Sequence, residues 1–182
     1  MNELYPLKFT PIFKDKIWGG DKIRTVFSMD YAPLPNCGEA WVLSGYGDEI
    51  SVVNNGFLAE NQLDELIDVY MGDLVGEAVF EKYGSKFPLL IKILNANDWL
   101  SIQVHPDDEL AKSRHNGLGK TEMWYVAEAE PGAELISGFN REMDAEHYIH
   151  DLNNGTIRDI LNYEKVKKGD VFFMPAGRVH AL

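Results

Sequence analysis

The sequence predicts a single, mainly β domain over residues 1–182, with helical insertions near 61–83 and 144–163. Three observations predict this fold class. Short apolar segments separated by Gly, Pro and Asn fill the first third of the chain, which is typical of strands joined by turns. Apolar residues change to helical spacing in the insertions. Compact apolar runs return afterwards, so we expect strands to build the core and helices to decorate it.

Each expected strand is a short apolar or alternating run that ends at turn residues. These runs lie at residues 7–13, 39–44, 49–53, 88–94, 100–104, 122–127, 133–139 and 171–174. The run at 88–94 is apolar enough for a buried strand. After residue 174, a Pro-Ala-Gly turn predicts a tight hairpin whose return strand carries His180.

The expected helices follow the 3.6-residue period of apolar positions. They lie at residues 61–83, where a second helix runs around 74–80, and at 107–114, 144–152 and 156–162. Asp144 and Thr156 are expected to be N-caps, because their side-chain oxygens can accept hydrogen bonds from free first-turn amides.

The composition is that of a soluble globular protein, with 45% hydrophobic and 25% charged residues. A net charge of −12 argues against nucleic acid as a partner, and an anionic substrate would need a local basic pocket. The single cysteine, Cys37, allows no intramolecular disulfide. Because no signal-peptide pattern and no membrane-spanning apolar run is visible, we expect a cytoplasmic protein without membrane contact. The oligomeric state stays open.

Two segments place polar side chains on one face of an expected strand. Ser101, Gln103 and His105 alternate with apolar residues, so they share a face. Unpaired amide and imidazole groups are costly in a core, which favours a face that lines a cavity. Lys120 and Glu122 share a face in the same way, at the start of an apolar strand.

A third segment has the specific spacing Gly169-x5-Pro175-x-Gly177-x2-His180. Its glycine and proline residues fix a turn that aims His180 inward. Imidazole, carboxylate and amide oxygen together suit a borderline divalent ion such as Zn²⁺, although each residue taken alone is compatible with an ordinary surface or core position. His147 and His150, three residues apart on an expected helix, are an alternative metal pair without a matching acidic or cysteine partner.

Several segments together resemble a known family. The segment from Gly169 to His180 matches the second sequence motif of the cupin superfamily. The other matching segments are Ile-Trp-Gly-Gly (17–20), Gly-Glu-Ala-Trp (38–41) with Ser44, Pro-Leu-Leu-Ile-Lys-Ile-Leu (88–94), Leu-Ser-Ile-Gln-Val-His-Pro-Asp (100–107) and Lys-Thr-Glu-Met-Trp (120–124). In this order they resemble class I mannose-6-phosphate isomerases, in particular the short bacterial form, over almost the whole chain. The resemblance implies a cupin (jelly-roll) β-barrel.

The resemblance also implies a site and a reaction. The zinc ligands would be Gln103, His105, Glu122 and His180, with Gln103 in place of the first histidine of the general cupin motif. The substrate would be a small sugar phosphate, because the family interconverts mannose-6-phosphate and fructose-6-phosphate through an enediol. Lys120 is the candidate catalytic cation beside the metal. Ser101 and Lys92 are the candidate substrate-binding residues, as contacts of the phosphate.

Similar family members continue beyond the cupin histidine with further strands and an arginine regarded as catalytic, whereas this chain stops at Leu182. We therefore expect a barrel that is incomplete at its C-terminus, a truncated chain that carries the metal-binding residues, and little or no turnover. Two other functions stay open: a different metal-dependent cupin enzyme, such as an iron-dependent oxygenase, and a non-catalytic cupin that binds sugar phosphates.

Overall fold

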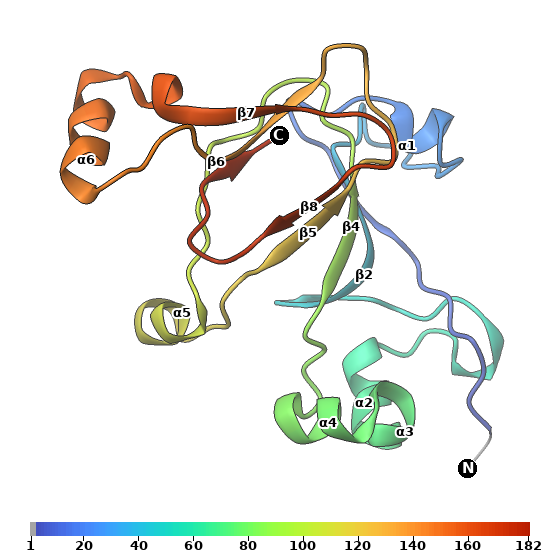
Figure 1. Cartoon of the computed structure of the whole chain (residues 1–182). Helices are drawn as coiled ribbons and strands as arrows, with labels where there is room; N and C mark the ends of the chain where they lie inside the picture. Colours follow the sequence, from blue (N-terminus) through green and yellow to red (C-terminus); the bar gives the residue numbers. More distant parts are fainter. Residues whose placement is uncertain (1–2) are drawn as a thin grey trace. The chain divides into compact units, whose positions relative to one another are not determined.

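The fold is known from a computed structural model, which describes residues 3–182. The chain divides into two compact units, one that extends to Asp98 and one from Trp99 to Leu182. The described residues contain both strands and helices (Figure 1), and every strand pairing is antiparallel. The strands form three small sheets, none of which closes on itself.

The sheet of the first unit is built around one long strand. β2 (Glu39–Tyr46) pairs with β1 (Ile12–Lys14), β3 (Glu49–Ile50) and β4 (Leu90–Leu94). The structure confirms the strand predicted at 39–44. The strands predicted at 7–13, 49–53 and 88–94 are shorter than expected. The prediction of a buried strand at 88–94 is wrong in part, because the side chain of Ile91 is 48% exposed. Apolar character alone does not say whether both faces of a strand are covered.

The expected helical insertion of the first unit consists of three short helices that lie close together (Figure 1). They are α2 (Leu63–Tyr70), α3 (Gly72–Val75) and α4 (Glu77–Tyr83); α1 (Lys22–Thr25) and a 3₁₀ turn (Gly56–Leu58) precede them. The prediction of one continuous helix around 74–80 is wrong. The segment is interrupted at Gly76, because its φ of 89° does not occur within an α-helix. α2 buries Leu63, Leu66 and Ile67, which confirms its predicted amphipathic face.

The second unit contains two sheets. β5 (Glu122–Tyr125) pairs with β8 (Val171–Met174), and β6 (Glu134–Phe139) lies between β7 (Leu161–Lys165) and β9 (His180–Ala181). The core of the β7–β6–β9 sheet includes Ile136, Leu161 and Ala181. The strands predicted at 133–139 and 171–174 are confirmed, and the one predicted at 122–127 is confirmed up to Tyr125. The predicted hairpin is wrong, because β8 and β9 belong to different sheets.

Two further predictions for the second unit have different outcomes. The strand expected at 100–104 is reduced to a single bridge between Gln103 and His180. The helix expected at 107–114 is confirmed as α5 (Asp108–His115), which Asp107 caps by accepting a hydrogen bond from the Leu110 amide.

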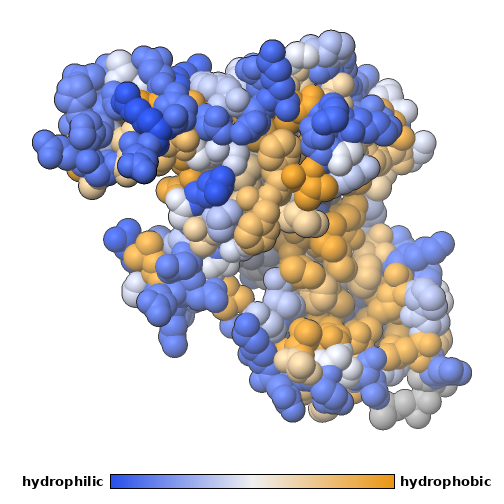
Figure 2. Space-filling model, in the orientation of Figure 1, coloured by the Kyte–Doolittle hydropathy of each residue, from blue (hydrophilic) through white to orange (hydrophobic). Residues whose placement is uncertain are grey.

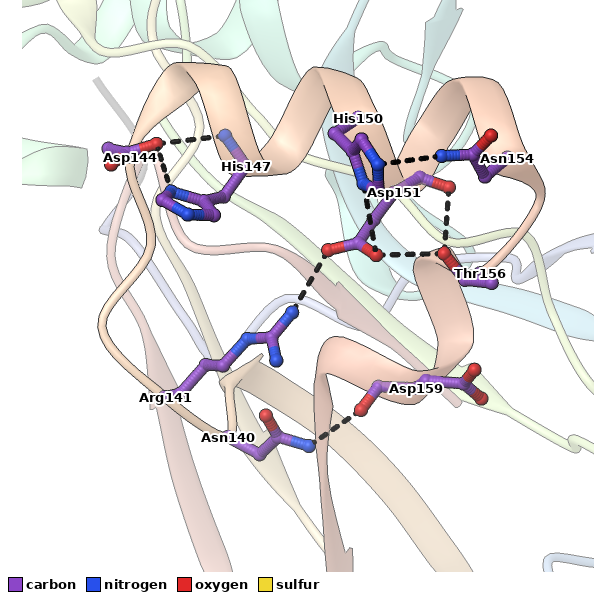
Figure 3. A network of polar contacts seen from close by, with 9 residues as sticks. All are labelled: Asn140, Arg141, Asp144, His147, His150, Asp151, Asn154, Thr156 and Asp159. Atoms are coloured by element: carbon purple, nitrogen blue, oxygen red, sulfur yellow. Dashed lines mark hydrogen bonds and ion pairs between the residues drawn. The ribbon is translucent and has the colours of Figure 1, made fainter.

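The insertion after β6 contains α6 (Ala145–Asn154) and a short 3₁₀ turn (Ile157–Ile160). Asp144 is the N-cap, as predicted, and accepts from the His147 amide at 2.8 Å. The side chain of Thr156 makes no capping hydrogen bond, contrary to prediction, and its hydroxyl donates to Asp151 at 2.8 Å (Figure 3). The helix expected at 156–162 is instead the 3₁₀ turn, and β7 begins at Leu161. In Figure 2 the surface around α6 is mostly hydrophilic.

No helix within residues 3–182 combines the length and the apolar character that crossing a membrane requires.

Candidate metal centre

Three segments of the second unit meet at one point. Gln103 and His180 exchange two backbone hydrogen bonds, 3.0 and 2.9 Å between nitrogen and oxygen. The amide of Gly177, which has a φ of 84°, donates to the carbonyl oxygen of His105 at 2.8 Å. The amide of Lys120 donates to the carbonyl oxygen of Pro106 at 3.1 Å. These backbone contacts connect the segments that carry His105, Lys120 and His180.

The side chains of His105, Glu122 and His180 converge. Nε2 of His105 lies 3.5 Å from Oε1 of Glu122, and Nε2 of His180 lies 3.3 Å from Oε2 of the same carboxylate. One potential ligand atom from each residue lies within 4.8 Å of the others. Within residues 3–182, this is the one group of at least three His, Cys, Asp or Glu side chains so arranged. The structure thus brings together three of the residues that the sequence singled out.

The hydrogen bonding of His180 leaves its inward nitrogen available as a ligand. Its side chain is 1% exposed, and Nδ1 lies 2.8 Å from the carbonyl oxygen of Arg178. A carbonyl oxygen only accepts, so Nδ1 must carry the proton, and in the neutral ring Nε2 then holds a lone pair. This buried Nε2 makes no hydrogen bond to a described residue, and it faces a carboxylate, which also only accepts. Two acceptors that face each other fit a bound cation between them.

Glu122 is held in its charged form. Burial acts most strongly and would raise its pKa, but a hydrogen bond from His180 when that ring is protonated, and the hydrogen bond and positive charge of Lys120, together outweigh burial and lower the pKa to about 2. The carboxylate is therefore ionised at neutral pH, which is the form that coordinates a metal.

Lys120 lies beside the cluster, as the same-face argument predicts. Its Nζ is 2.9 Å from Oε1 of Glu122, and its side chain is 44% exposed. An exposed ammonium group next to the three converging side chains could meet a charged group of a ligand.

Three other residues were predicted to belong to the site: Gln103, Ser101 and Lys92. Gln103 pairs with His180 across an antiparallel bridge, so the two side chains leave the backbone on the same face. Ser101 is exposed. Lys92 belongs to β4 of the first unit, where its Nζ lies 3.5 Å from Oε2 of Glu39.

The alternative histidine pair lies on α6 (Figure 3). His147 contacts the side chain of Asp144 at 2.8 Å, and His150 contacts that of Asn154 at 3.1 Å. The two rings therefore have different partners, one at the start of the helix and one in its second half. Among the described residues, neither histidine belongs to a group of three side chains that could hold a metal ion.

Sequence reasoning missed two groups that surround His180. One is the carbonyl oxygen of Arg178, a backbone contact with no sequence signal. The other is Trp124, whose ring centroid lies 5.4 Å from that of His180. Trp124 follows Glu122 by two residues on β5, so the i, i+2 rule that paired Lys120 with Glu122 would have found it.

The donor set suits zinc. Two imidazole nitrogens and one carboxylate are a common catalytic zinc set, which leaves a further position for water, substrate or another ligand. Similar donors also hold iron, so the residues alone define a divalent-metal site.

Comparison with known proteins agrees with this description. Residues 6–132 match the model of the family "Phosphomannose isomerase type I, catalytic domain". The chain is 41% identical over 180 residues to a protein of Bacillus subtilis named as a probable mannose-6-phosphate isomerase, GmuF, covering 98% of this chain and 55% of that protein. It is also 41% identical over 177 residues to mannose-6-phosphate isomerase of Streptococcus mutans, covering 97% of this chain and 54% of the relative.

A solved structure shows the same fold. The mannose 6-phosphate isomerase from Bacillus subtilis superposes with a TM-score of 0.87 at 36% identity, covering 97% of this chain and 55% of that one. The chain therefore spans about half the length of the relatives that it matches.

Proposed function

Because the chain belongs to the type I phosphomannose isomerase family, we propose that it forms the metal-binding part of a mannose-6-phosphate isomerase. The proposed reaction is the interconversion of mannose-6-phosphate and fructose-6-phosphate. The observation that carries the proposal is the convergence of His105, Glu122 and His180, whose ligand atoms lie within 4.8 Å of one another. The relatives named mannose-6-phosphate isomerase support the choice of substrate.

The proposed cofactor is Zn²⁺, held by His105, Glu122 and His180, with Gln103 as a further ligand. The side chain of Gln103 leaves the backbone on the same face as that of His180, which favours this role. When bound, zinc would supply Lewis-acid polarisation of the substrate oxygens. The chain's own groups fix the position of this centre, since Glu122 is ionised and the His180 ring is held through its Nδ1 proton.

Lys120 is the proposed catalytic cation. The isomerisation moves a proton between C2 and C1 of the sugar, and negative charge develops on the substrate oxygens as the enediol forms. The Lys120 ammonium is held at the cluster by Glu122 at 2.9 Å, so it can stabilise this charge without a large movement.

The proposed phosphate contact within the second unit is Ser101. A net charge of −12 gives an anionic substrate no general attraction, so local positive groups and hydroxyls must bind it. We propose that both compact units belong to one cupin-type domain, and that the protein acts on a small-molecule substrate in the cytoplasm.

The test is to measure the metal content and the isomerase activity of the protein that contains this chain. We expect His105→Ala and His180→Ala to lose zinc and the conversion of mannose-6-phosphate together. His150→Ala, a histidine outside the cluster, is the matched control and should keep both. Retention of metal and activity in the His105→Ala and His180→Ala variants would contradict the proposal.

A further inference from the structure

The two faces of the β5–β8 ribbon differ in what they contact. In the antiparallel register, Glu122 is opposite Met174, and Trp124 is opposite Phe172. Met174 is 1% exposed, so this face is directed inward. The side chains of the other face are all largely exposed: Met123 69%, Tyr125 63%, Val171 59% and Phe173 64%. Trp124 is thus the aromatic side chain of β5 that shares the inward face with Glu122.

The indole of Trp124 meets the imidazole of His180 nearly at a right angle. The ring centroids lie 5.4 Å apart, and the planes form an angle of 83°. This is the edge-to-face geometry that aromatic rings favour. On another side, the ring of His105 lies 4.9 Å from that of His180 with an angle of 55°. The imidazole of His180 therefore has an aromatic neighbour that is not itself a candidate ligand.

The orientation of a histidine ring needs such support. The χ2 torsion of histidine is broad, so the side chain does not fix the ring plane by itself. The hydrogen bond from Nδ1 to the carbonyl oxygen of Arg178 fixes the tautomer and one point of the ring. The indole of Trp124 restricts rotation about that point, and Nε2 then stays directed at the carboxylate of Glu122, 3.3 Å away.

We propose that Trp124 is a positioning residue for the metal centre, which holds the His180 imidazole in the orientation that binds the ion. The inference rests on the proposed metal-binding function and adds to it a residue outside the ligand set. Outer-shell partners that hydrogen-bond to a metal-binding histidine typically contribute tenfold to a hundredfold to metal affinity, and we expect the ring contact of Trp124 to act at the lower end of this range. An aromatic ring is needed at this position, whereas apolar volume alone is not sufficient.

The experiment compares the zinc dissociation constants of wild type, Trp124→Phe and Trp124→Leu, measured by competition with a chromophoric chelator. Tyr125→Leu, the same kind of change on the exposed face of the same strand, is the matched control. We expect Trp124→Leu to weaken zinc binding about tenfold, and Trp124→Phe and Tyr125→Leu to stay within about threefold of wild type.

A second readout separates positioning from a general loss of stability. The visible absorption of the Co²⁺-substituted chain reports the ligand geometry, and we expect its bands to shift in Trp124→Leu and to be restored in Trp124→Phe. Thermal unfolding of the metal-free variants shows whether each one is folded.

Unchanged zinc affinity and an unchanged Co²⁺ spectrum in folded Trp124→Leu would overturn the inference and leave the proposed function intact. Equal losses in Trp124→Leu and Tyr125→Leu would also overturn it, since the effect would then not be specific to the inward face. A wild-type chain that binds neither ion would overturn the proposed metal site itself.

Discussion

Gln103 and His180 exchange both of their backbone hydrogen bonds, although 77 positions (180 minus 103) separate them in the sequence. This bridge holds the segment that carries Gln103 against the strand that carries His180, and both residues are candidate ligands. The positions of the ligands thus depend on backbone pairing between distant segments, and the predictions below test the groups that this pairing brings together.

Lys120 is predicted to act in turnover and not in metal binding. Lys120→Met removes the ammonium that lies 2.9 Å from Glu122, so we expect kcat to fall at least about a hundredfold while the zinc content is unchanged. The measurement is steady-state isomerase kinetics of the protein that contains this chain, with metal analysis. Lys168→Met, which breaks the exposed pair with Glu128, is the control and should leave kcat unchanged. Full activity of Lys120→Met would exclude the role proposed for this lysine.

Glu122 is predicted to make the stability of the metal-free chain depend on pH in the acidic range. Because folding lowers its pKa from 4.5 to about 2, the carboxylate stabilises the fold above about pH 4.5, and this contribution is lost as pH falls towards 2. The shift corresponds to about 3 kcal/mol. Urea unfolding of wild type and Glu122→Gln should therefore show a larger difference in free energy at pH 6 than at pH 3. An equal difference at both values would contradict the account.

Met71 is predicted to be a site where glycine stabilises the fold. Its φ of 49° and ψ of −128° lie in a region that side chains with a Cβ rarely adopt, and its side chain is 51% exposed. Met71→Gly removes strain of about 1–3 kcal/mol and costs about 1 kcal/mol in chain entropy, so we expect a net gain of about 1 kcal/mol. Chemical denaturation measures it. Val69→Gly, at an exposed position inside α2, should instead destabilise, and a loss of stability in both variants would refute the assignment.

Asp151 is predicted to fix the insertion that contains α6. Its carboxylate accepts from Arg141 at 3.0 Å and from Thr156 at 2.8 Å (Figure 3), and it is only 14% exposed. We expect Asp151→Ala to destabilise the insertion by about 1–3 kcal/mol, because these charge-assisted hydrogen bonds are lost. Hydrogen exchange of the α6 amides should become faster while zinc affinity stays the same. Unchanged exchange in α6 would show that the network contributes little.

The sequence predicts the ligand positions better than the connections between strands. The spacing that ends at His180 is a local property of one turn, and the i, i+2 rule relates Lys120 to Glu122 within a few residues; both signals are short-range. The partner of β9 is β6, which lies more than forty residues earlier, so the predicted hairpin with β8 was wrong. Non-local pairing of this kind leaves no trace in periodicity.

The errors in the helices have local causes of a different kind. Gly76, with φ of 89°, divides a segment whose apolar spacing is helical throughout. The side chain of Thr156 donates to Asp151 and makes no capping hydrogen bond, and the predicted helix is replaced by one 3₁₀ turn and β7. In both segments a pattern that is correct on average does not decide the local backbone conformation.

Zinc titration of the chain tests whether His105, Glu122 and His180 form one metal site. We expect one tightly bound Zn²⁺ per wild-type chain, at least a hundredfold weaker binding in the His105→Ala, His180→Ala double variant, and unchanged binding in the His147→Ala, His150→Ala double variant. Wild-type affinity in the first variant, or loss of zinc in the second, would contradict this assignment.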